Sequence, residues 1–160
     1  YPLAKQDKNI LSGLVTRSLE IKKGYIEIDE FDRNKRQVFN YGHSFGHAIE
    51  SLTNYEVPHG IAVSYGMDMA NFVSVKLNYL ADKIRQEIRE LLEQIWDGHV
   101  ISNLSVEKFA NALNKDKKNM GKELRLILCK GYGKPFKTGI LLDSQFMSWL
   151  EEYFDKELIH

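Results

Sequence analysis

Three of the five histidines in the chain lie within one short stretch, "GHSFGHAIESLTNYEVPHG", at residues 42–60. His43 and His47 are four residues apart, so their side chains share one face if the stretch is helical. His59 follows Pro58, where a loop can fold it back towards that face. Imidazoles spaced in this way are common ligands of zinc. The cluster therefore predicts a metal site, but spacing alone leaves open which histidines bind, and an i, i+4 pair also occurs in ordinary helix packing.

Small and acidic residues around the histidines strengthen this prediction. Gly42 and Gly46 let a second backbone or a ligand approach the helix closely. Glu50 lies three residues after His47 and stays on the same side of a helix. A carboxylate in that position is more typical of a partner that orients a metal-binding histidine than of a ligand.

The elements that must position this cluster are predicted mainly as helices, because apolar residues recur at three- and four-residue spacing or fill whole segments. The predicted helices span residues 8–28, 41–53, 61–79, 82–96, 106–114 and 144–156, and Ser105 is the predicted N-cap of the fifth. Alternating and apolar residues at 123–131, followed by "KPFKTGILL", predict a β-hairpin. The predicted fold class is a mainly α, multi-helix domain with a small β-hairpin.

Two of these helices are expected to pack differently. Segment 61–79 is apolar on most sides, which is typical of a buried helix. Segment 82–96 carries its apolar residues on one stripe, which predicts an amphipathic helix with a solvated face. That stripe consists of Ile84, Ile88, Leu91, Leu92 and Ile95.

Composition and charge argue against several classes of protein. The chain has 160 residues with 22 basic and 22 acidic side chains, and this balance argues against nucleic acid as its main partner. No apolar run approaches the roughly 20 residues that cross a bilayer, so no membrane segment is expected. Cys129 is the only cysteine, which excludes an intrachain disulfide and indicates a reducing, cytoplasmic compartment. The chain begins at Tyr1 rather than Met, so we expect a piece of a longer protein.

The histidine cluster is part of a longer pattern that resembles the C-terminal domain of the 3-dehydroquinate synthase family and its sugar-phosphate cyclase relatives. In that family a line R-x-x-x-N-x-G-H-[TS]-x-G-H-A-x-E is followed by H-G and then by G-M. The matching residues are Arg36, Asn40, Gly42, His43, Ser44, Gly46, His47, Ala48, Glu50, His59, Gly60, Gly66 and Met67. Lys22 matches a lysine of the family's preceding helix, and residues 116–119 match its D-K-K-N. The resemblance covers about residues 11–130 and implies, for residues 1–160, the C-terminal metal- and substrate-binding domain of the dehydroquinate synthase-like fold.

The resemblance implies a role for each matched side chain. His43 and His59 resemble the two histidine ligands of a catalytic Zn²⁺ or Co²⁺ ion, and His47 resembles the histidine that contacts the substrate's phosphate. Cationic and amide donors suit a phosphate, a carboxylate and hydroxyl groups. The residues that resemble these substrate-holding groups are Lys22, Arg36, Asn40 and Lys117.

The implied activity is a multistep lyase reaction of the shikimate pathway, which serves aromatic amino acid biosynthesis. Bound NAD oxidises a hydroxyl of 3-deoxy-D-arabino-heptulosonate 7-phosphate, phosphate leaves, the ketone is reduced, and an aldol step closes the carbocycle. The metal polarises the hydroxyl and then the ketone as a Lewis acid. The expected partners are the sugar-phosphate substrate, an upstream NAD-binding domain of the same polypeptide and a second copy of the chain in a homodimer.

Two parts of the family's machinery have no counterpart in these 160 residues. The family's third zinc ligand is a glutamate in an A-E-x-x-K-like context upstream of the matched segment, and no such string precedes residue 11. No G-x-G-x-x-G or G-G-G string occurs, so no NAD-binding residue is expected here. Catalytic zinc typically has three protein ligands. We therefore expect the chain alone to bind zinc weakly and to be inactive.

Ile61 is the main departure from the family pattern, in which a glutamate usually follows His-Gly. It keeps another sugar-phosphate cyclase, such as 2-deoxy-scyllo-inosose synthase, open as an alternative. A metal-dependent alcohol dehydrogenase of the related fold also has clustered histidines, but it would not need Arg36, Asn40 and the lysines at 116–119. A non-catalytic helical scaffold module is a further alternative.

Overall fold

The computed structural model describes residues 2–31, 33, 35–96, 98–101, 104–114 and 123–158. Lys117 and the rest of segment 116–119 lie outside these residues, so the role of Lys117 stays a prediction. The chain divides into two compact units, Tyr1–Phe39 and Asn40–His160, which are described separately below. The interpretation of residues 1–160 as one domain of a larger enzyme also stays a prediction.

The first unit contains α1 (Pro2–Gln6), α2 (Lys8–Ile28) and most of the 3-10 helix η1 (Lys35–Asn40). Asp7 caps α2, because its carboxylate accepts from the backbone N–H of Asn9 at 2.8 Å. The helix predicted at 8–28 is therefore confirmed with the same bounds.

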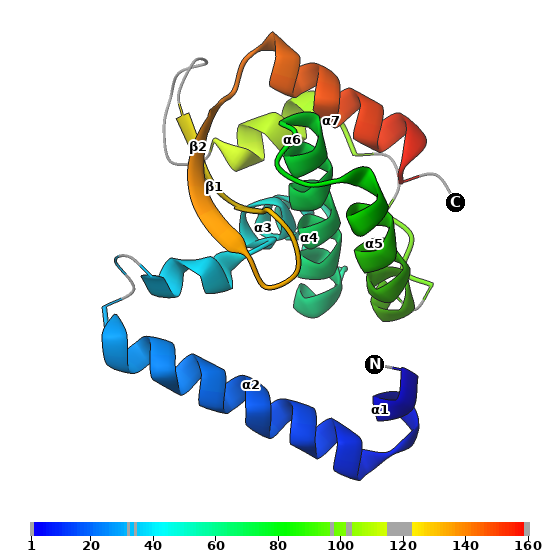
Figure 1. Cartoon of the computed structure of the whole chain (residues 1–160). Helices are drawn as coiled ribbons and strands as arrows, with labels where there is room; N and C mark the ends of the chain where they lie inside the picture. Colours follow the sequence, from blue (N-terminus) through cyan, green and yellow to red (C-terminus); the bar gives the residue numbers. More distant parts are fainter. Residues whose placement is uncertain are drawn as a thin grey trace. The chain divides into compact units, whose positions relative to one another are not determined.

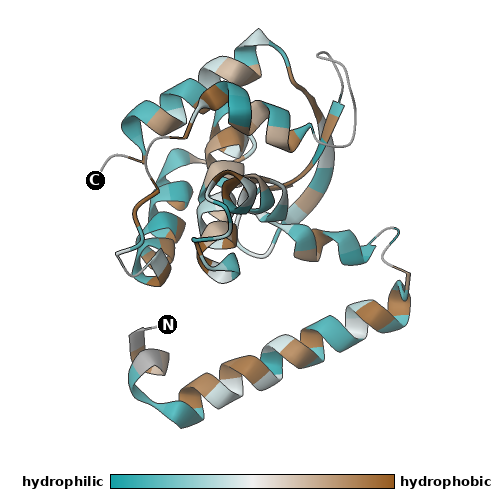
Figure 2. Ribbon diagram, turned by 180° about the vertical axis from the view of Figure 1, so that it is seen from behind, coloured by the Kyte–Doolittle hydropathy of each residue, from teal (hydrophilic) through white to brown (hydrophobic). Residues whose placement is uncertain are grey.

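The apolar residues of α2 are exposed. No residue of this helix is buried, and Leu14 and Leu19 are 51% and 61% exposed. Figure 2 shows hydrophobic and hydrophilic residues interleaved along the whole helix. Near its end, Tyr25 packs edge-to-face against Phe39, with 5.0 Å between the ring centroids. This aromatic contact holds η1 against α2 within the first unit.

The second unit is built around α4 (His59–Lys76), which lies in the middle of this unit in Figure 1. This helix packs against α3 (His43–Leu52), α5 (Asp82–Trp96), α7 (Ser144–Lys156) and β1 (Glu123–Cys129). A further helix, α6 (Val106–Leu113), packs against α3 and α7. Ser105 caps α6 as predicted, since its Oγ accepts from the N–H of Lys108 at 3.3 Å. In the part of the chain that the structure describes, no helix is both long enough and apolar enough to span a membrane.

The helix predicted at 61–79 is α4, and it is buried as expected, but it begins two residues earlier. Pro58 has φ −58° and ψ 142°, and its carbonyl accepts from the N–H groups of Ile61 and Ala62. His59 is therefore the first residue of a helix and not part of a loop folded back onto α3. The buried polar residues of α4 are Ser64, Asp68, Asn71 and Ser74.

The amphipathic helix predicted at 82–96 is confirmed as α5, with Leu92 of the predicted apolar stripe in the core, but two arginines are buried beside that stripe. The buried residues of this helix are Arg85, Arg89, Leu92 and Trp96. Leu91, which was expected on the stripe, is 48% exposed. The reason lies on α4, where the fully buried carboxylate of Asp68 needs cationic partners. Arg85 Nη2 and Arg89 Nη1 donate to Asp68 Oδ2 at 3.0 and 2.8 Å, which turns the arginine face of α5 towards α4.

The predicted hairpin consists of β1 and β2 (Pro135–Leu141), which pair antiparallel with Cys129 opposite Pro135. Ser74 on α4 accepts from the backbone N–H of Cys129 at 3.1 Å, so the end of β1 is tied to the central helix. Together with the helices, this hairpin confirms the mainly α fold class predicted from the sequence.

Candidate metal centre

Three glycines set the distance between α3 and α4. Gly42 precedes α3 with φ +79°, a left-handed conformation that glycine adopts without strain. A Cβ at Gly66 would lie 2.1 Å from the carbonyl oxygen of Gly42 and 2.7 Å from the nitrogen of Gly46. A Cβ at Gly46 would lie 2.9 Å from Cα of Val63. Because no side chain separates the two backbones, α3 and α4 pack closely enough for their first residues to meet.

This close packing brings all three predicted histidines together. His43 and His47 lie one turn apart on α3, and His59 is the first residue of α4. The ring centroids are 5.6 Å apart for His43 and His47, 5.4 Å for His43 and His59, and 5.9 Å for His47 and His59. His47 and His59 are exposed, so the triangle of imidazoles is open to solvent on one side.

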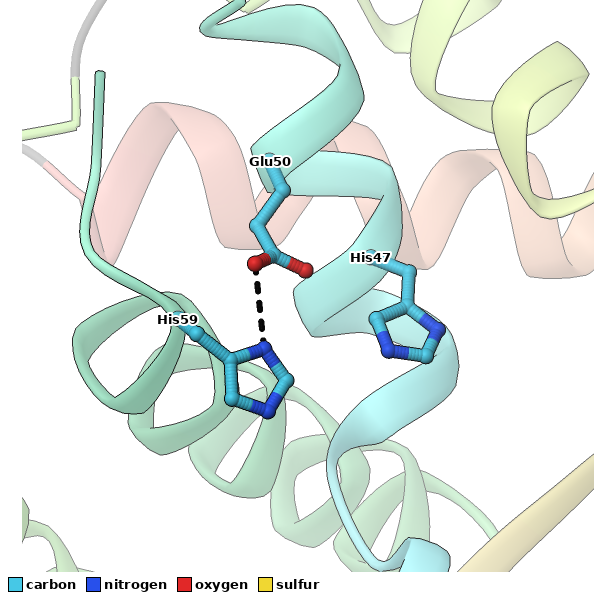
Figure 3. Close-up of side chains that lie close together, drawn as sticks. All are labelled: His47, Glu50 and His59. Carbon is cyan, nitrogen blue, oxygen red and sulfur yellow. Dashed lines mark hydrogen bonds and ion pairs between the residues drawn. The ribbon is translucent and has the colours of Figure 1, made fainter. Parts of the chain in front are cut away.

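Glu50 holds the ring of His59. Its Oε1 lies 3.0 Å from Nδ1 of His59, and Figure 3 shows the carboxylate reaching towards both the His59 and His47 rings. Because a carboxylate can only accept, Nδ1 of His59 carries the proton and Nε2 keeps a free lone pair. Glu50 is only 8% exposed, so the bond is shielded from water. A carboxylate bonded to an imidazole in this way is typical of metal-binding histidines.

His43 has a partner of a different kind. Its Nδ1 lies 3.2 Å from the backbone carbonyl oxygen of Tyr41. A carbonyl can also only accept, so Nδ1 of His43 carries the proton and Nε2 is free. His43 and His59 thus present the same ring nitrogen for a metal. Sequence reasoning missed Tyr41, because a backbone carbonyl leaves no signal in the residue type.

The donor set fits a divalent metal of the zinc or cobalt type. One ligand atom from each of His47, Glu50 and His59 lies within 4.8 Å of the other two. Imidazole nitrogens and a carboxylate oxygen are the ligands of many catalytic zinc sites, where they lie about 2.0–2.2 Å from the ion. The expected ligand pair, His43 and His59, shares His59 with this set and lies next to it.

The other predicted substrate-binding residues lie on two different units. Asn40 is the last residue of η1 and is exposed, three residues before His43. Lys22 is exposed on α2, and Arg36 in η1 donates from Nη1 to the backbone carbonyl of Glu30 at 2.9 Å. Since Lys22 and Arg36 belong to the first unit, their approach to the histidines of the second stays a prediction.

Ile61, the main departure from the family pattern, lies in the first turn of α4, two residues after His59. It is partly buried and packs against the hydrophobic core of the second unit. An aliphatic side chain here adds apolar contact where the pattern usually has a charged carboxylate.

Comparison with known families and curated proteins gives one consistent result. Residues 2–119 match the family described as "3-dehydroquinate synthase C-terminal". The 3-dehydroquinate synthase of Campylobacter jejuni subsp. jejuni (strain 81-176) is 32% identical over 148 residues, which are 92% of this chain and 42% of the relative. That of Helicobacter pylori (strain G27) is 36% identical over 150 residues, 93% of this chain and 44% of the relative. The chain spans about two-fifths of the length of these relatives.

Two solved structures of 2-deoxy-scyllo-inosose synthase share the fold. One, a complex with carbaglucose-6-phosphate, NAD+ and Co2+, matches with a TM-score of 0.67 and 24% identity over 76% of this chain and 35% of that chain. The other matches with a TM-score of 0.62 and 25% identity over 76% of this chain and 34% of that chain. Over the matched part of the chain, the fold is therefore similar to that of these two synthase structures.

Proposed function

Since the chain belongs to the 3-dehydroquinate synthase family, we propose that it forms the metal- and substrate-binding domain of a phosphate-eliminating sugar-phosphate cyclase. The observation that carries this proposal is the convergence of three imidazoles and one buried carboxylate where α3 meets α4. Four titratable groups at the closest approach of two helices are typical of a site that binds a metal or an anion.

His43 and His59 are the proposed ligands of a Zn²⁺ or Co²⁺ ion, through Nε2 in both cases. When bound, the ion supplies Lewis-acid polarisation of a hydroxyl and of the ketone formed from it. Glu50 keeps the His59 ring in orientation through the 3.0 Å hydrogen bond. Catalytic zinc typically has three protein ligands, and the third is proposed to come from an upstream part of the polypeptide. The chain alone is therefore expected to bind the ion weakly and to be inactive.

His47 is the proposed contact for the substrate's phosphate. It is exposed, and its ring lies 5.6 Å from that of His43, so a phosphate held by His47 lies beside the ion. An imidazole N–H donated to a phosphate oxygen stabilises the charge that grows as the phosphate leaves. The remaining substrate groups are proposed to be held by Lys22, Arg36, Asn40 and Lys117.

The proposed substrate is 3-deoxy-D-arabino-heptulosonate 7-phosphate, which places the enzyme among the carbon–oxygen lyases of the shikimate pathway. NAD is proposed to bind mainly to an upstream domain, and the relatives are long enough to contain one, since the chain spans 42% and 44% of two of them. A homodimer in the cytoplasm is the proposed form of the complete enzyme.

A second candidate is a cyclase of the 2-deoxy-scyllo-inosose synthase type acting on glucose 6-phosphate. The specific observation in its favour is Ile61, which removes the family's usual carboxylate from the first turn of α4. The two candidates share metal, NAD and phosphate elimination, and they differ in the sugar that fits next to the metal.

The deciding measurement is the release of inorganic phosphate by the full-length polypeptide supplied with NAD and Zn²⁺. With 3-deoxy-D-arabino-heptulosonate 7-phosphate, we expect release that falls at least a hundredfold in His43→Ala, because one of the metal ligands is lost. His99→Ala is the matched control, since His99 is exposed and lies outside the cluster. It should release phosphate at the unmodified rate.

Other results of this measurement would reject the leading candidate. Release from glucose 6-phosphate alone would replace the leading candidate by the second. No release from any sugar phosphate would reject both, leaving a metal-dependent alcohol dehydrogenase or a non-catalytic scaffold. A scaffold would tolerate His43→Ala and His59→Ala without loss of its function.

A further inference from the structure

Tyr41 makes hydrogen bonds to two helices, α3 and α4. Its backbone carbonyl accepts from Nδ1 of His43 at 3.2 Å, and its side-chain hydroxyl donates to Oδ1 of Asn71 on α4. An amide oxygen can only accept, so the Tyr41 hydroxyl is the donor in this bond. The tyrosine therefore connects the start of α3 with the middle of α4.

Asn71 is an energetically unfavourable residue at its position. It is fully buried on α4, and its Nδ2 has no hydrogen-bond partner among the residues that the structure describes. A buried amide with an unpaired donor is less favourable than an apolar side chain of similar size. Core packing alone therefore does not account for an asparagine here, whereas the acceptor that it offers to Tyr41 does.

The backbone between Tyr41 and His43 passes through Gly42, which has φ +79° and makes no side-chain cap for α3. A glycine restricts the chain less than any other residue. The direction of the Tyr41 carbonyl therefore depends on where the tyrosine side chain is held, and Asn71 holds it from α4.

We propose that Tyr41 and Asn71 are positioning residues of the metal centre. Their hydrogen bond keeps the Tyr41 carbonyl where it accepts from Nδ1–H of His43, so that Nε2 of His43 faces the ion. His43 obtains from this buried pair the orientation that His59 obtains from Glu50. The inference rests on the proposed function, because it takes His43 as a metal ligand.

The experiment uses the full-length protein with Co²⁺ as the probe. Tyr41→Phe and Asn71→Leu each leave the other partner buried and unpaired, so each should lower stability. The double variant Tyr41→Phe/Asn71→Leu replaces both partners by apolar side chains and should recover most of that stability. We expect the folded double variant to bind Co²⁺ about tenfold more weakly, with a changed visible absorption spectrum of the bound ion.

Ser74→Ala is the matched control. Ser74 is fully buried on the same helix, where it donates to the carbonyl of Ala70 at 2.7 Å and accepts from Cys129 at 3.1 Å. Its loss removes buried hydrogen bonds but leaves the Tyr41–Asn71 bond in place. An unchanged Co²⁺ affinity and spectrum in the double variant would overturn the inference. The inference would also be overturned if Tyr41→Phe and Ser74→Ala, at the same loss of stability, lowered the Co²⁺ affinity equally.

His43→Ala distinguishes failure of this inference from failure of the proposed function. If His43→Ala leaves the Co²⁺ spectrum unchanged, His43 is not a ligand and the proposed metal site itself is wrong. If His43→Ala alters the spectrum while the double variant does not, only the role of Tyr41 and Asn71 is rejected.

Discussion

At the scale of single residues, the proposed site depends on which ring nitrogen of each histidine carries the proton. Both His43 and His59 donate from Nδ1, one to a backbone carbonyl at 3.2 Å and the other to a carboxylate at 3.0 Å. A bond to a charged acceptor is stronger than a bond to a carbonyl. The orientation of the His59 ring therefore depends on a single side chain, Glu50. The orientation of the His43 ring depends on the position of the backbone before α3.

Glu50 gives the sharpest prediction at this scale. In the full-length protein, Glu50→Ala removes the acceptor for His59, and Co²⁺ affinity should fall about 10- to 100-fold. Glu50→Gln keeps an acceptor oxygen and should lose much less. Titration with Co²⁺, followed by visible absorption, measures both changes.

The control for this prediction is Glu56→Ala, because Glu56 is an exposed carboxylate shortly after the end of α3. It should bind Co²⁺ like the unmodified protein. Equal losses in Glu50→Gln and Glu50→Ala would contradict an orienting role and would assign the carboxylate of Glu50 to the ion itself.

At the scale of elements, the α3–α4 contact is the part of the fold that makes a metal site possible. His59 reaches the α3 histidines because α4 begins at that residue and because Gly42, Gly46 and Gly66 keep the two backbones close. Any side chain at Gly66 has to displace the carbonyl of Gly42, which directly precedes His43. Stability and metal binding should therefore be lost together at this position.

Gly66→Ala tests this coupling. The added methyl group would lie 2.1 Å from the Gly42 carbonyl oxygen, so the helices must separate. We expect a loss of about 1–3 kcal/mol in the free energy of unfolding, measured by urea denaturation, together with weaker Co²⁺ binding. Gly60→Ala, in the first turn of the same helix with open space around its Cβ, should be neutral or slightly stabilising. A Gly66→Ala protein with native stability and Co²⁺ affinity would show that the contact is not needed.

At the scale of the whole molecule, a buried charge network joins the central helix to the end of the chain. Asp68 on α4 accepts from Arg85, from Arg89 and from the hydroxyl of Tyr153 on α7, the last at 2.8 Å. Burial raises the pKa of Tyr153 well above its ordinary value, so its hydroxyl remains a donor. Glu157 pairs with both arginines, at 3.0 and 2.7 Å, so the charges of the network have partners on three elements.

Asp68→Ala should be among the most damaging single changes in the second unit. Among the residues that the structure describes, it leaves two buried guanidinium groups with the partly exposed Glu157 and Glu93 as their acidic partners. We expect the free energy of unfolding to fall by about 3–5 kcal/mol, measured by urea denaturation. Glu20→Ala, which removes one partner of an exposed ion pair on α2, is the control and should be nearly neutral. Similar small effects in both variants would contradict a structural role for the network.

The sequence by itself determined the class of fold, most helix bounds and the three histidines that the structure brings together. The helices at 8–28 and 82–96 have the predicted bounds, because hydrophobic periodicity acts over a few neighbouring residues. The N-cap Ser105 was predictable for the same reason, since a cap bonds within its own first turn. The ordered pattern from Arg36 to Met67 was specific enough to indicate the family, and the match over residues 2–119 confirms it.

Only the tertiary structure decided which side chains meet. Arg85 and Arg89 lie outside the predicted apolar stripe of α5, yet Asp68, 17 and 21 residues away, buries them. Tyr41 meets Asn71 across 30 residues, and neither residue type indicates the other. Periodicity and capping are local properties, whereas these contacts depend on how whole helices pack. That packing follows from close backbone approach and from the pairing of buried charges, which act between segments that are distant in the sequence.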